Sequence, residues 1–235
     1  MELSAILSDD VIYNLARGPF VWISLSVCIV GTILRTIHFI SLTKVEKRNI
    51  RIQRIGSIKQ KSPRNFSLKD LARFFSNLKL TIIGTSPTTI VVSCIFHLFL
   101  IITPIFLLAH NILIEEAIGF SLFSFSERFT NGLTFIFLIC AAYFLIRRIF
   151  LPRLRVISSA YDYVILLIST APFLTGCLAY YQAFDYKSFI ILHMLTGELM
   201  LMAIPFTKIY HMVFFFVGRF VLINQNTLGK GSRAW

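Results

Sequence analysis

The sequence predicts an all-α integral membrane protein, a bundle of five transmembrane helices with a periplasmic N-terminus and a cytoplasmic C-terminus. Three observations lead to this prediction. Of the 235 residues, 56% are hydrophobic and only 14% are charged, which leaves too little polar surface for a soluble domain. The apolar residues gather in five runs, and a helix needs about 20 such residues to cross a bilayer. The positive charges, finally, lie on one side of the expected membrane.

The five runs give the expected helices in chain order. Their approximate bounds, within one membrane domain over 1–235, are 19–42, 82–114, 129–150, 160–182 and 188–223. The second and fifth runs exceed one membrane thickness, so we expect these helices to tilt. Pro104, Pro172 and Pro205 fall inside the second, fourth and fifth runs and are expected to kink them. The residues before the first run lack the pattern of a cleavable signal peptide.

Eighteen Lys and Arg residues lie on one side of the expected membrane and three on the other. The larger group comprises eleven in the loop 44–80, together with Arg147, Arg148, Arg153, Arg155, Arg219, Lys230 and Arg233. The smaller group is Arg17, Arg128 and Lys187, accompanied by seven acidic residues. Because positively charged loops stay in the cytoplasm, we expect the larger group there, in a protein of the inner (cytoplasmic) membrane. This asymmetry accounts for most of the net charge of +12 without nucleic acid as a partner.

The basic cytoplasmic loop 44–80 allows three interpretations. Its second half, 67–80, carries apolar residues at helical spacing, which favours an amphipathic helix on the inner membrane surface. A solvated basic loop held to anionic lipid explains the charge as well. A docking surface for a cytoplasmic partner is compatible with either.

All five histidines fall inside apolar runs, where ionisable residues are costly and usually functional. With the N-terminus outside, His110 and His193 both lie near the outer face, and His97 and His211 both lie nearer the cytoplasm. Two histidine pairs at two depths suit two haem b groups, because neutral imidazole binds the iron from each side. These four residues are therefore the predicted axial ligands of the haem iron. His38 is the spare candidate for the inner haem.

The spacing on the two helices supports these pairs unequally. His193 and His211 are five helical turns apart, so both rings would point the same way, separated by about 27 Å along the axis. The positions of His97 and His110 give about 20 Å and an azimuthal difference of about 140° on an ideal helix. A kink or π-bulge near Pro104 would be needed to re-aim one ring.

These features resemble a known family. Five helices with an external N-terminus and histidine pairs on the second and fifth are similar to the γ subunit of respiratory nitrate reductase. Three segments resemble more closely the membrane cytochrome b subunits of the Tmc complexes of sulfate-reducing bacteria. They are FHLFLIITPIFLLAHNIL (96–113), FLIRRIFLPRLRVISSAYDYVILLISTAPFLTG (144–176) and DYKSFIILHMLTGELMLMAIPFTKIYHMVFFF (185–216). The membrane subunits of Dsr and heterodisulfide reductase complexes are more distant likenesses.

The resemblance implies a role in electron transport. Such subunits hold two haem b groups and pass electrons between a periplasmic multihaem cytochrome c, menaquinone and a cytoplasmic iron–sulfur subunit of heterodisulfide-reductase type. The chain would then be the electron-transfer part of a quinone-linked oxidoreductase complex and not an enzyme alone. Membrane lipid is its remaining partner.

Two further groups of residues are candidates for cofactor contacts. The first group lies near the expected cytoplasmic boundary and comprises Arg35, Arg147, Arg148 and Lys208. These cations would either contact haem propionates or extend their charged ends to the membrane interface. Around the outer haem, polar quinone candidates, which are also ordinary interface anchors, are Asn111, Glu115, Tyr181, Gln182 and Lys187. Glu198, inside the fifth helix, belongs either to a quinone or proton site or to a neutral structural hydrogen bond.

Two other functions suit a five-helix membrane protein. One is a haem-free anchor that holds the cytoplasmic and periplasmic subunits of a complex together. The other is a small transporter whose histidines relay protons, for which internal repeats would be expected. The four cysteines form no CxxC or CxxCH motif, which argues against an iron–sulfur cluster, a structural zinc and covalently attached haem.

Overall fold

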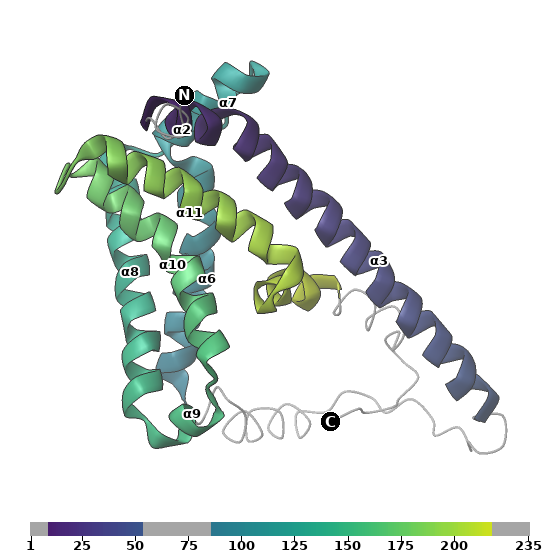
Figure 1. Ribbon diagram of the computed structural model, residues 1–235. Helices are drawn as coiled ribbons and strands as arrows, with labels where there is room; N and C mark the ends of the chain where they lie inside the picture. The colour runs from purple at the N-terminus through teal and green to yellow at the C-terminus, as the bar shows by residue number, and fades with distance from the viewer. Residues whose placement is uncertain (1–8, 54–85, 218–235) are drawn as a thin grey trace, which may run out of the picture. The chain divides into compact units, whose positions relative to one another are not determined.

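The computed structural model describes residues 9–53 and 86–217, and for residues 43–53 it describes the helical backbone. These parts are mainly helical and contain no β-strand (Figure 1). Five helices are long and apolar enough to cross a membrane, namely Asp10–Leu42, Pro87–Phe106, Glu127–Phe150, Ala160–Tyr180 and Tyr186–Phe206. The chain is an all-helical, multi-pass membrane protein, and the prediction of five spans is confirmed.

The chain divides into two compact units. The first combines Met1–Ser67 with Gly197–Trp235, and the second is Leu68–Thr196. Helix α11 (Tyr186–Phe206) begins in the second unit and ends in the first. Each unit is therefore described by itself.

The first unit begins with a long helix built from three consecutive pieces. They are α2 (Asp9–Leu15), the π-helical turn η1 (Ala16–Phe20) and α3 (Val21–Gln53). Pro19 lies inside η1, and this wider turn accommodates a residue that has no N–H to donate without ending the helix. The helix therefore begins before the expected position 19.

α3 also continues past the expected end at position 42. No glycine or proline occurs between Gly31 and Gln53, so the sequence has no strong stop signal there. Residues 44–53, expected as part of the basic loop, are helical. The rest of that loop, including the predicted amphipathic helix at 67–80, and the basic C-terminal tail lie outside the described residues.

The end of α11 packs on α3 inside the first unit. A Cβ atom at Gly31 would lie 2.8 Å from both Cβ and Cγ of Pro205, so glycine permits this close approach. Five residues further along each segment, the hydroxyl oxygens of Thr36 and Tyr210 are 2.8 Å apart. Both residue numbers rise together, so the two segments run parallel.

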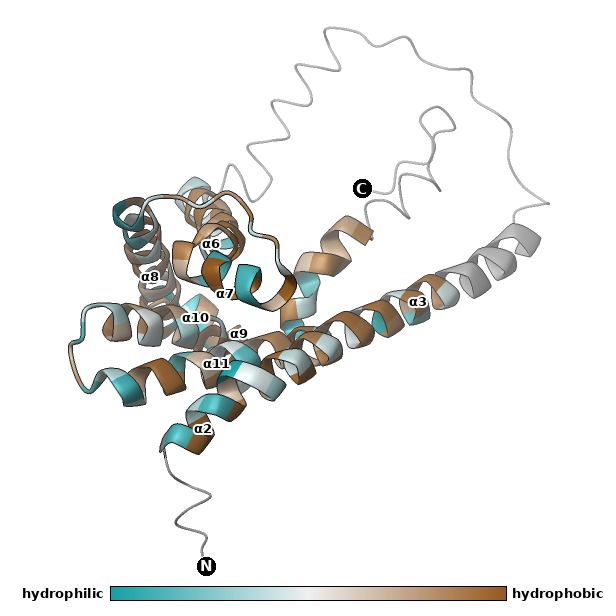
Figure 2. Cartoon of the chain, turned by 90° about the horizontal axis from the view of Figure 1, so that it is seen from above, coloured by the Kyte–Doolittle hydropathy of each residue, from teal (hydrophilic) through white to brown (hydrophobic). Residues whose placement is uncertain are grey.

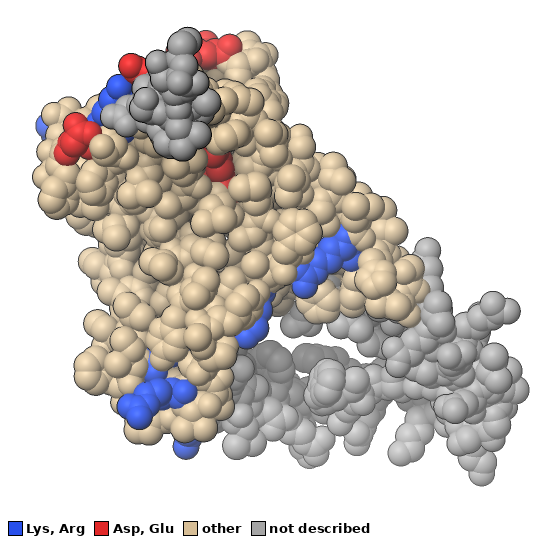
Figure 3. Space-filling view, in the orientation of Figure 1, with Lys and Arg blue, Asp and Glu red and all other residues tan. Residues whose placement is uncertain are grey.

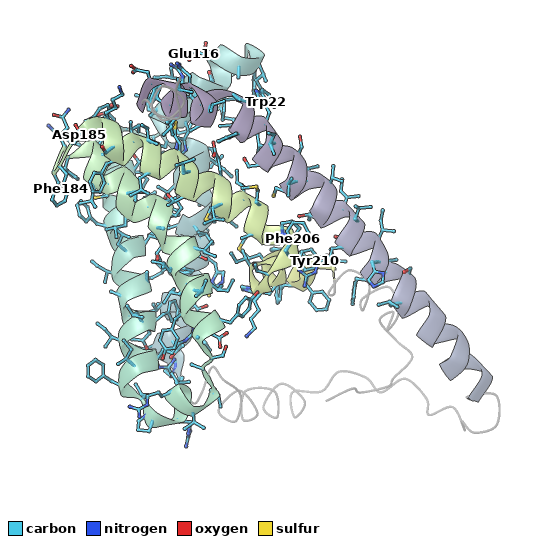
Figure 4. All side chains as sticks on the ribbon, viewed as in Figure 1. Trp22, Glu116, Phe184, Asp185, Phe206 and Tyr210 are labelled. Carbon is cyan, nitrogen blue, oxygen red and sulfur yellow. The ribbon has the colours of Figure 1, made fainter. Side chains whose placement is uncertain are left out.

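The expected fifth helix, 188–223, is wrong as a single helix. α11 ends at Phe206, and Thr207 adopts an extended conformation with φ −116° and ψ −176°. A short 3₁₀ helix, η3 (Lys208–Tyr210), follows, and helical residues resume at 211–217. Phe206 and Tyr210 lie on the two sides of this break (Figure 4). Five unbroken turns therefore do not connect the two histidines predicted on this helix.

The second unit is built on three helices that lie side by side (Figure 1). They are α6 (Pro87–Phe106), α8 (Glu127–Phe150) and α10 (Ala160–Tyr180). Phe137 of α8 is fully buried and stacks between Phe96 of α6 and Phe173 of α10, with ring centroids 4.6 Å and 3.9 Å apart. This aromatic stack forms the core between the three helices.

Charges separate to opposite ends of the second unit. Arg147, Arg148, Arg153 and Arg155 lie at the end of α8 and on the following α9 (Pro152–Ile157). Acidic residues lie at the other end, on α7 (Leu108–Ile118), at the start of α8 and before α11. Figure 3 shows blue atoms at the lower end, and red atoms with some blue ones at the upper end. Such polarity fits a unit whose ends face the two sides of a membrane.

Apolar side chains face outward along the spans. On α3, Trp22, Ile29, Leu34 and Ile37 are all more than half exposed, and apolar residues extend along this helix (Figure 2). A soluble protein would bury such side chains. Their exposure is explained by contact with membrane lipid.

Candidate functional site

α6 and α7 are separated by a single extended residue, Leu107, with φ −72° and ψ 129°. The break deprives the last carbonyl groups of α6 of their regular helical partners. Other groups donate to these carbonyls instead. His110 Nδ1 donates to Pro104 O at 2.8 Å, Asn111 Nδ2 to Ile105 O at 3.0 Å, and Phe125 N to Phe106 O at 3.0 Å. The predicted irregularity near Pro104 is present, as a break three residues later and not as a π-bulge.

Asn111 stabilises this break with both ends of its amide. The side chain is 1% exposed, and Nδ2 also donates to Leu107 O at 3.2 Å. Oδ1 accepts from the backbone N–H of Leu122 at 3.1 Å. Asn111, predicted as a quinone contact, thus has backbone partners on both sides of the break that precedes His110.

His193 is held from α10. Its Nδ1 donates to the carbonyl oxygen of Pro172 at 2.8 Å. A Cβ atom at Gly176 would lie 2.8 Å from Nδ1 and 2.9 Å from Cε1 of His193, so the ring rests directly on the glycine backbone. Beside it, the hydroxyl oxygens of Thr175 and Thr196 lie 3.3 Å apart across the two helices. Close contact between α10 and α11 thus fixes the position of the imidazole.

The structure brings His110 and His193 together. Their ring centroids are 5.9 Å apart and their planes differ by 17°. Both rings are half-buried. In each ring Nδ1 carries the proton, because a carbonyl oxygen can only accept, so the neutral imidazole presents the lone pair of Nε2.

This pair suits one metal ion held between two imidazoles. An ion bonded to one nitrogen of each ring at about 2.0–2.1 Å would separate the ring centroids by roughly 6 Å. Within residues 9–53 and 86–217, no group of three or more His, Cys, Asp or Glu side chains could hold a metal. Two histidines alone would leave the other positions of such a metal to a non-protein group, as in haem.

The other two predicted ligands share this hydrogen-bond pattern. Nδ1 of His97, on α6 in the second unit, donates to Ser93 O at 2.7 Å. Nδ1 of His211, after η3 in the first unit, donates to Lys208 O at 2.6 Å. By contrast, His38 is bonded through its backbone carbonyl, which accepts from Ser41 Oγ. The pattern favours the four predicted ligands over His38.

Two of the four predicted propionate cations already bind backbone carbonyls. Arg35 donates to the carbonyl oxygens of Pro205 and Thr207 and lies 4.4 Å from the centroid of the Tyr210 ring, so it caps the broken end of α11. Arg148 donates to Asp162 O at 2.8 Å, at the start of α10. Arg147 is half-buried near the end of α8, and Lys208 begins η3.

The remaining quinone candidates lie at the acidic end of the second unit. Tyr181 and Gln182 form the turn after α10, and the Tyr181 ring lies 5.9 Å from the Phe135 ring. Lys187 is in the first turn of α11, and Glu115 is exposed on α7. Asp185, directly before α11 (Figure 4), accepts from Ser188 N at 2.8 Å. Hydrogen bonds from the Ser188 side chain and backbone hold the pKa of Asp185 below its ordinary value.

Gln182 is in the left-handed region, with φ 49°, and completes a helix C-terminal motif. Its N–H donates to Ala179 O and the N–H of Ala183 donates to Leu178 O, the Schellman pattern that favours glycine at this position. We expect Gln182→Gly to stabilise the protein by about 0.5–1 kcal/mol, because it removes the steric cost of a left-handed side chain. Thermal unfolding of the purified protein measures the change. Ala183→Gly is the control, and an equal gain there would contradict this explanation.

One curated protein of Nitratidesulfovibrio vulgaris, named only "Protein", is 34% identical to this chain over 231 residues. The match covers 94% of this chain and 96% of the other. The chain belongs to the same family as this protein. The name of the relative states no activity, so the family by itself assigns none.

No family model and no solved structure matches this chain. The match within the family includes nearly the whole length of both chains, so it is not confined to one apolar segment. The evidence for function therefore lies in the histidines and their surroundings.

Sequence reasoning missed most of what orients these histidines. The carbonyl acceptors at Ser93, Pro104 and Lys208 lie within six residues of their histidines, so a search for such neighbours could have found them. The acceptor at Pro172 lies 21 residues from His193 on another helix and carries no local signal. The supporting role of Asn111 likewise depends on a break that the sequence did not locate.

Proposed function

We propose that this chain is a di-haem b electron-transfer subunit of a quinone-linked respiratory complex in the inner (cytoplasmic) membrane. The observation that carries the proposal is the His110–His193 pair, with near-parallel rings 5.9 Å apart and each Nδ1 bound to a backbone carbonyl. Hydrogen bonding of the second ring nitrogen is the usual support of a metal-bound histidine. Apolar helices around it supply the insulating medium that electron transfer requires.

Each residue of the pair has a defined task. His110 and His193 would hold the iron through Nε2, and the carbonyls of Pro104 and Pro172 would keep both rings in their present orientation. Bound haem would supply one-electron redox chemistry. His97 and His211, with Nδ1 bound in the same way, are the proposed ligands of the second haem.

The partners follow from the resemblance to the nitrate reductase γ-subunit-like family and to Tmc cytochrome b subunits. We propose menaquinone as the quinone, a periplasmic multihaem cytochrome c on the outer side and an iron–sulfur subunit of heterodisulfide-reductase type in the cytoplasm. The charged ends of the second unit provide different surfaces on the two sides of the membrane for such partners.

The haem content of the purified chain tests this proposal. A pyridine haemochrome assay is expected to give two haem b groups per chain, and a reduced-minus-oxidised spectrum should show a b-type α band. A protein that folds without haem would instead support the haem-free anchor. One haem per chain would restrict the proposal to the His110–His193 pair.

The same function requires one orientation in the membrane. We expect the turn at 119–126 to face the periplasm and α9, with Arg153 and Arg155, to face the cytoplasm, because positive residues are retained inside. Alkaline phosphatase fused after residue 122 should be active and the same enzyme fused after residue 157 inactive. The opposite activities would reverse the proposed topology.

A further inference from the structure

Glu198 of α11 is a buried carboxyl group whose partner is missing. Its side chain is 6% exposed, and Oε1 has no hydrogen-bond partner within the described part of the chain. Other acids have local tasks: Asp162 and Asp185 cap helices, and Glu127 accepts from the Tyr180 hydroxyl at 3.1 Å. A buried carboxyl without a partner is costly and calls for an explanation outside helix capping.

The helix register places Glu198 on the side of α11 that meets α3. Pro205 is seven residues further along, on the same face, and touches Gly31. Because the two segments run parallel, the same step back along α3 reaches Ser24, which is fully buried and donates to Val21 O. Glu198 and Ser24 are thus at the same level within the first unit.

Among the described side chains of the first unit, no cation lies at this level. The titratable and charged residues on the facing side of η1 and α3 are Arg17, Cys28, Arg35 and His38. Arg17 is seven residues before Ser24, about 10 Å along the axis, and Arg35 is eleven residues after it, about 16 Å. Arg35 is also occupied by the end of α11. A charge on Glu198 therefore finds no counter-ion among these side chains.

The proposed haem ligand on the same helix is His193. His193 precedes Glu198 by five residues, about 7.5 Å along α11. A ferric haem with two neutral ligands carries one net positive charge at its core, which reduction removes. Five residues also turn the helix by about 140°, so the two side chains project from different faces, and the carboxyl lies roughly 15 Å from an iron bound to His193. At that distance and an effective dielectric constant of about 20, two unit charges interact by roughly twice RT. The proton affinity of Glu198 would then change roughly sixfold between the two oxidation states.

We propose that Glu198 is a redox-linked proton acceptor, which takes up one proton when the iron held by His110 and His193 is reduced. This inference rests on the proposed function. One electron from the quinol or another donor converts ferric to ferrous iron, and one proton from solvent bonds to a carboxylate oxygen of Glu198. Reoxidation releases both. The carboxyl would keep the net charge in the membrane constant while electrons pass.

Redox titration of the purified, haem-loaded chain between pH 5 and 9 tests the proposal. The midpoint potential of the component lost in His193→Ala should fall as pH rises, because reduction takes up a proton. In Glu198→Gln, which has similar shape and no titratable group, the same potential should not depend on pH. Glu116→Gln, an exposed carboxyl on α7, is the matched control and should keep the wild-type dependence.

A redox-difference infrared spectrum of the wild-type protein gives a second, independent measurement. Reduction should add a carboxylic-acid C=O band, which shifts in deuterium oxide and is absent from Glu198→Gln. A pH-independent potential without such a band in the wild type would overturn the inference even if Glu198→Gln failed to assemble. So would a pH dependence that Glu198→Gln retains. A chain that binds no haem would instead refute the proposed function, and this inference with it.

Discussion

His193→Ala and His110→Ala are each expected to remove one haem, and the same haem, from the purified protein. The two rings form one pair at 5.9 Å, so the loss of either leaves the iron with a single protein ligand. The haemochrome content should fall from two haems to one, and the same component should disappear from the redox titration of both variants. The double variant should lose nothing further.

Two other histidine variants serve as controls for this result. His97→Ala should remove the other component, and His38→Ala should retain both. Separate components lost in His193→Ala and His110→Ala would show that the two residues serve different sites. If His38→Ala lost a haem and His97→Ala kept both, the inner ligand would be His38.

Gly176→Val is expected to abolish the site formed by His193 while leaving the helical fold in place. Even a Cβ atom here would lie 2.8 Å from Nδ1 and 2.9 Å from Cε1 of His193, and valine adds two methyl groups. The ring cannot retreat without losing its 2.8 Å hydrogen bond to Pro172 O. Overpacking of this kind costs about 1–3 kcal/mol, so we expect a lower unfolding temperature together with the loss of one haem.

Gly132→Ala is the matched control for Gly176→Val. Gly132 lies inside α8, where an added Cβ would have no neighbour within 4 Å. Alanine at such a position should stabilise the helix by about 1 kcal/mol and leave the haem content unchanged. Normal haem content in Gly176→Val would show that the ring can move, and that the close approach at Gly176 has no role in the site.

The number of spans could be predicted from the sequence because bilayer thickness constrains each helix strongly. Helix ends were harder to predict. Pro19 lies within a π-helical turn and does not mark a start, and α3 continues through a charged stretch because that stretch contains no stop signal. The break at Thr207 was missed because the apolar pattern continues across it, although Pro205 directly precedes the last residue of α11.

For the candidate site, too, the sequence predicted one part and missed another. Depth in the membrane predicted that His110 and His193 belong together, and the structure brings them together. The arguments from ideal helical azimuth failed, since a break at Leu107 interrupts one histidine-bearing segment and Thr207 interrupts the other. The tertiary contacts at Pro172 and Gly176 join residues on different helices, which a single sequence read for local spacing does not reveal.

The hydrogen bonds of the two imidazoles have a consequence for biogenesis. Backbone carbonyls at Pro104 and Pro172 hold the rings, so their rotamers are selected when the helices pack and do not depend on a bound group. Ordering a mobile side chain on binding costs about 0.5–1.5 kcal/mol, and this cost is largely removed for both ligands. The apoprotein should therefore fold first and accept haem in a late maturation step, and haem added to the folded apoprotein in detergent should bind without refolding.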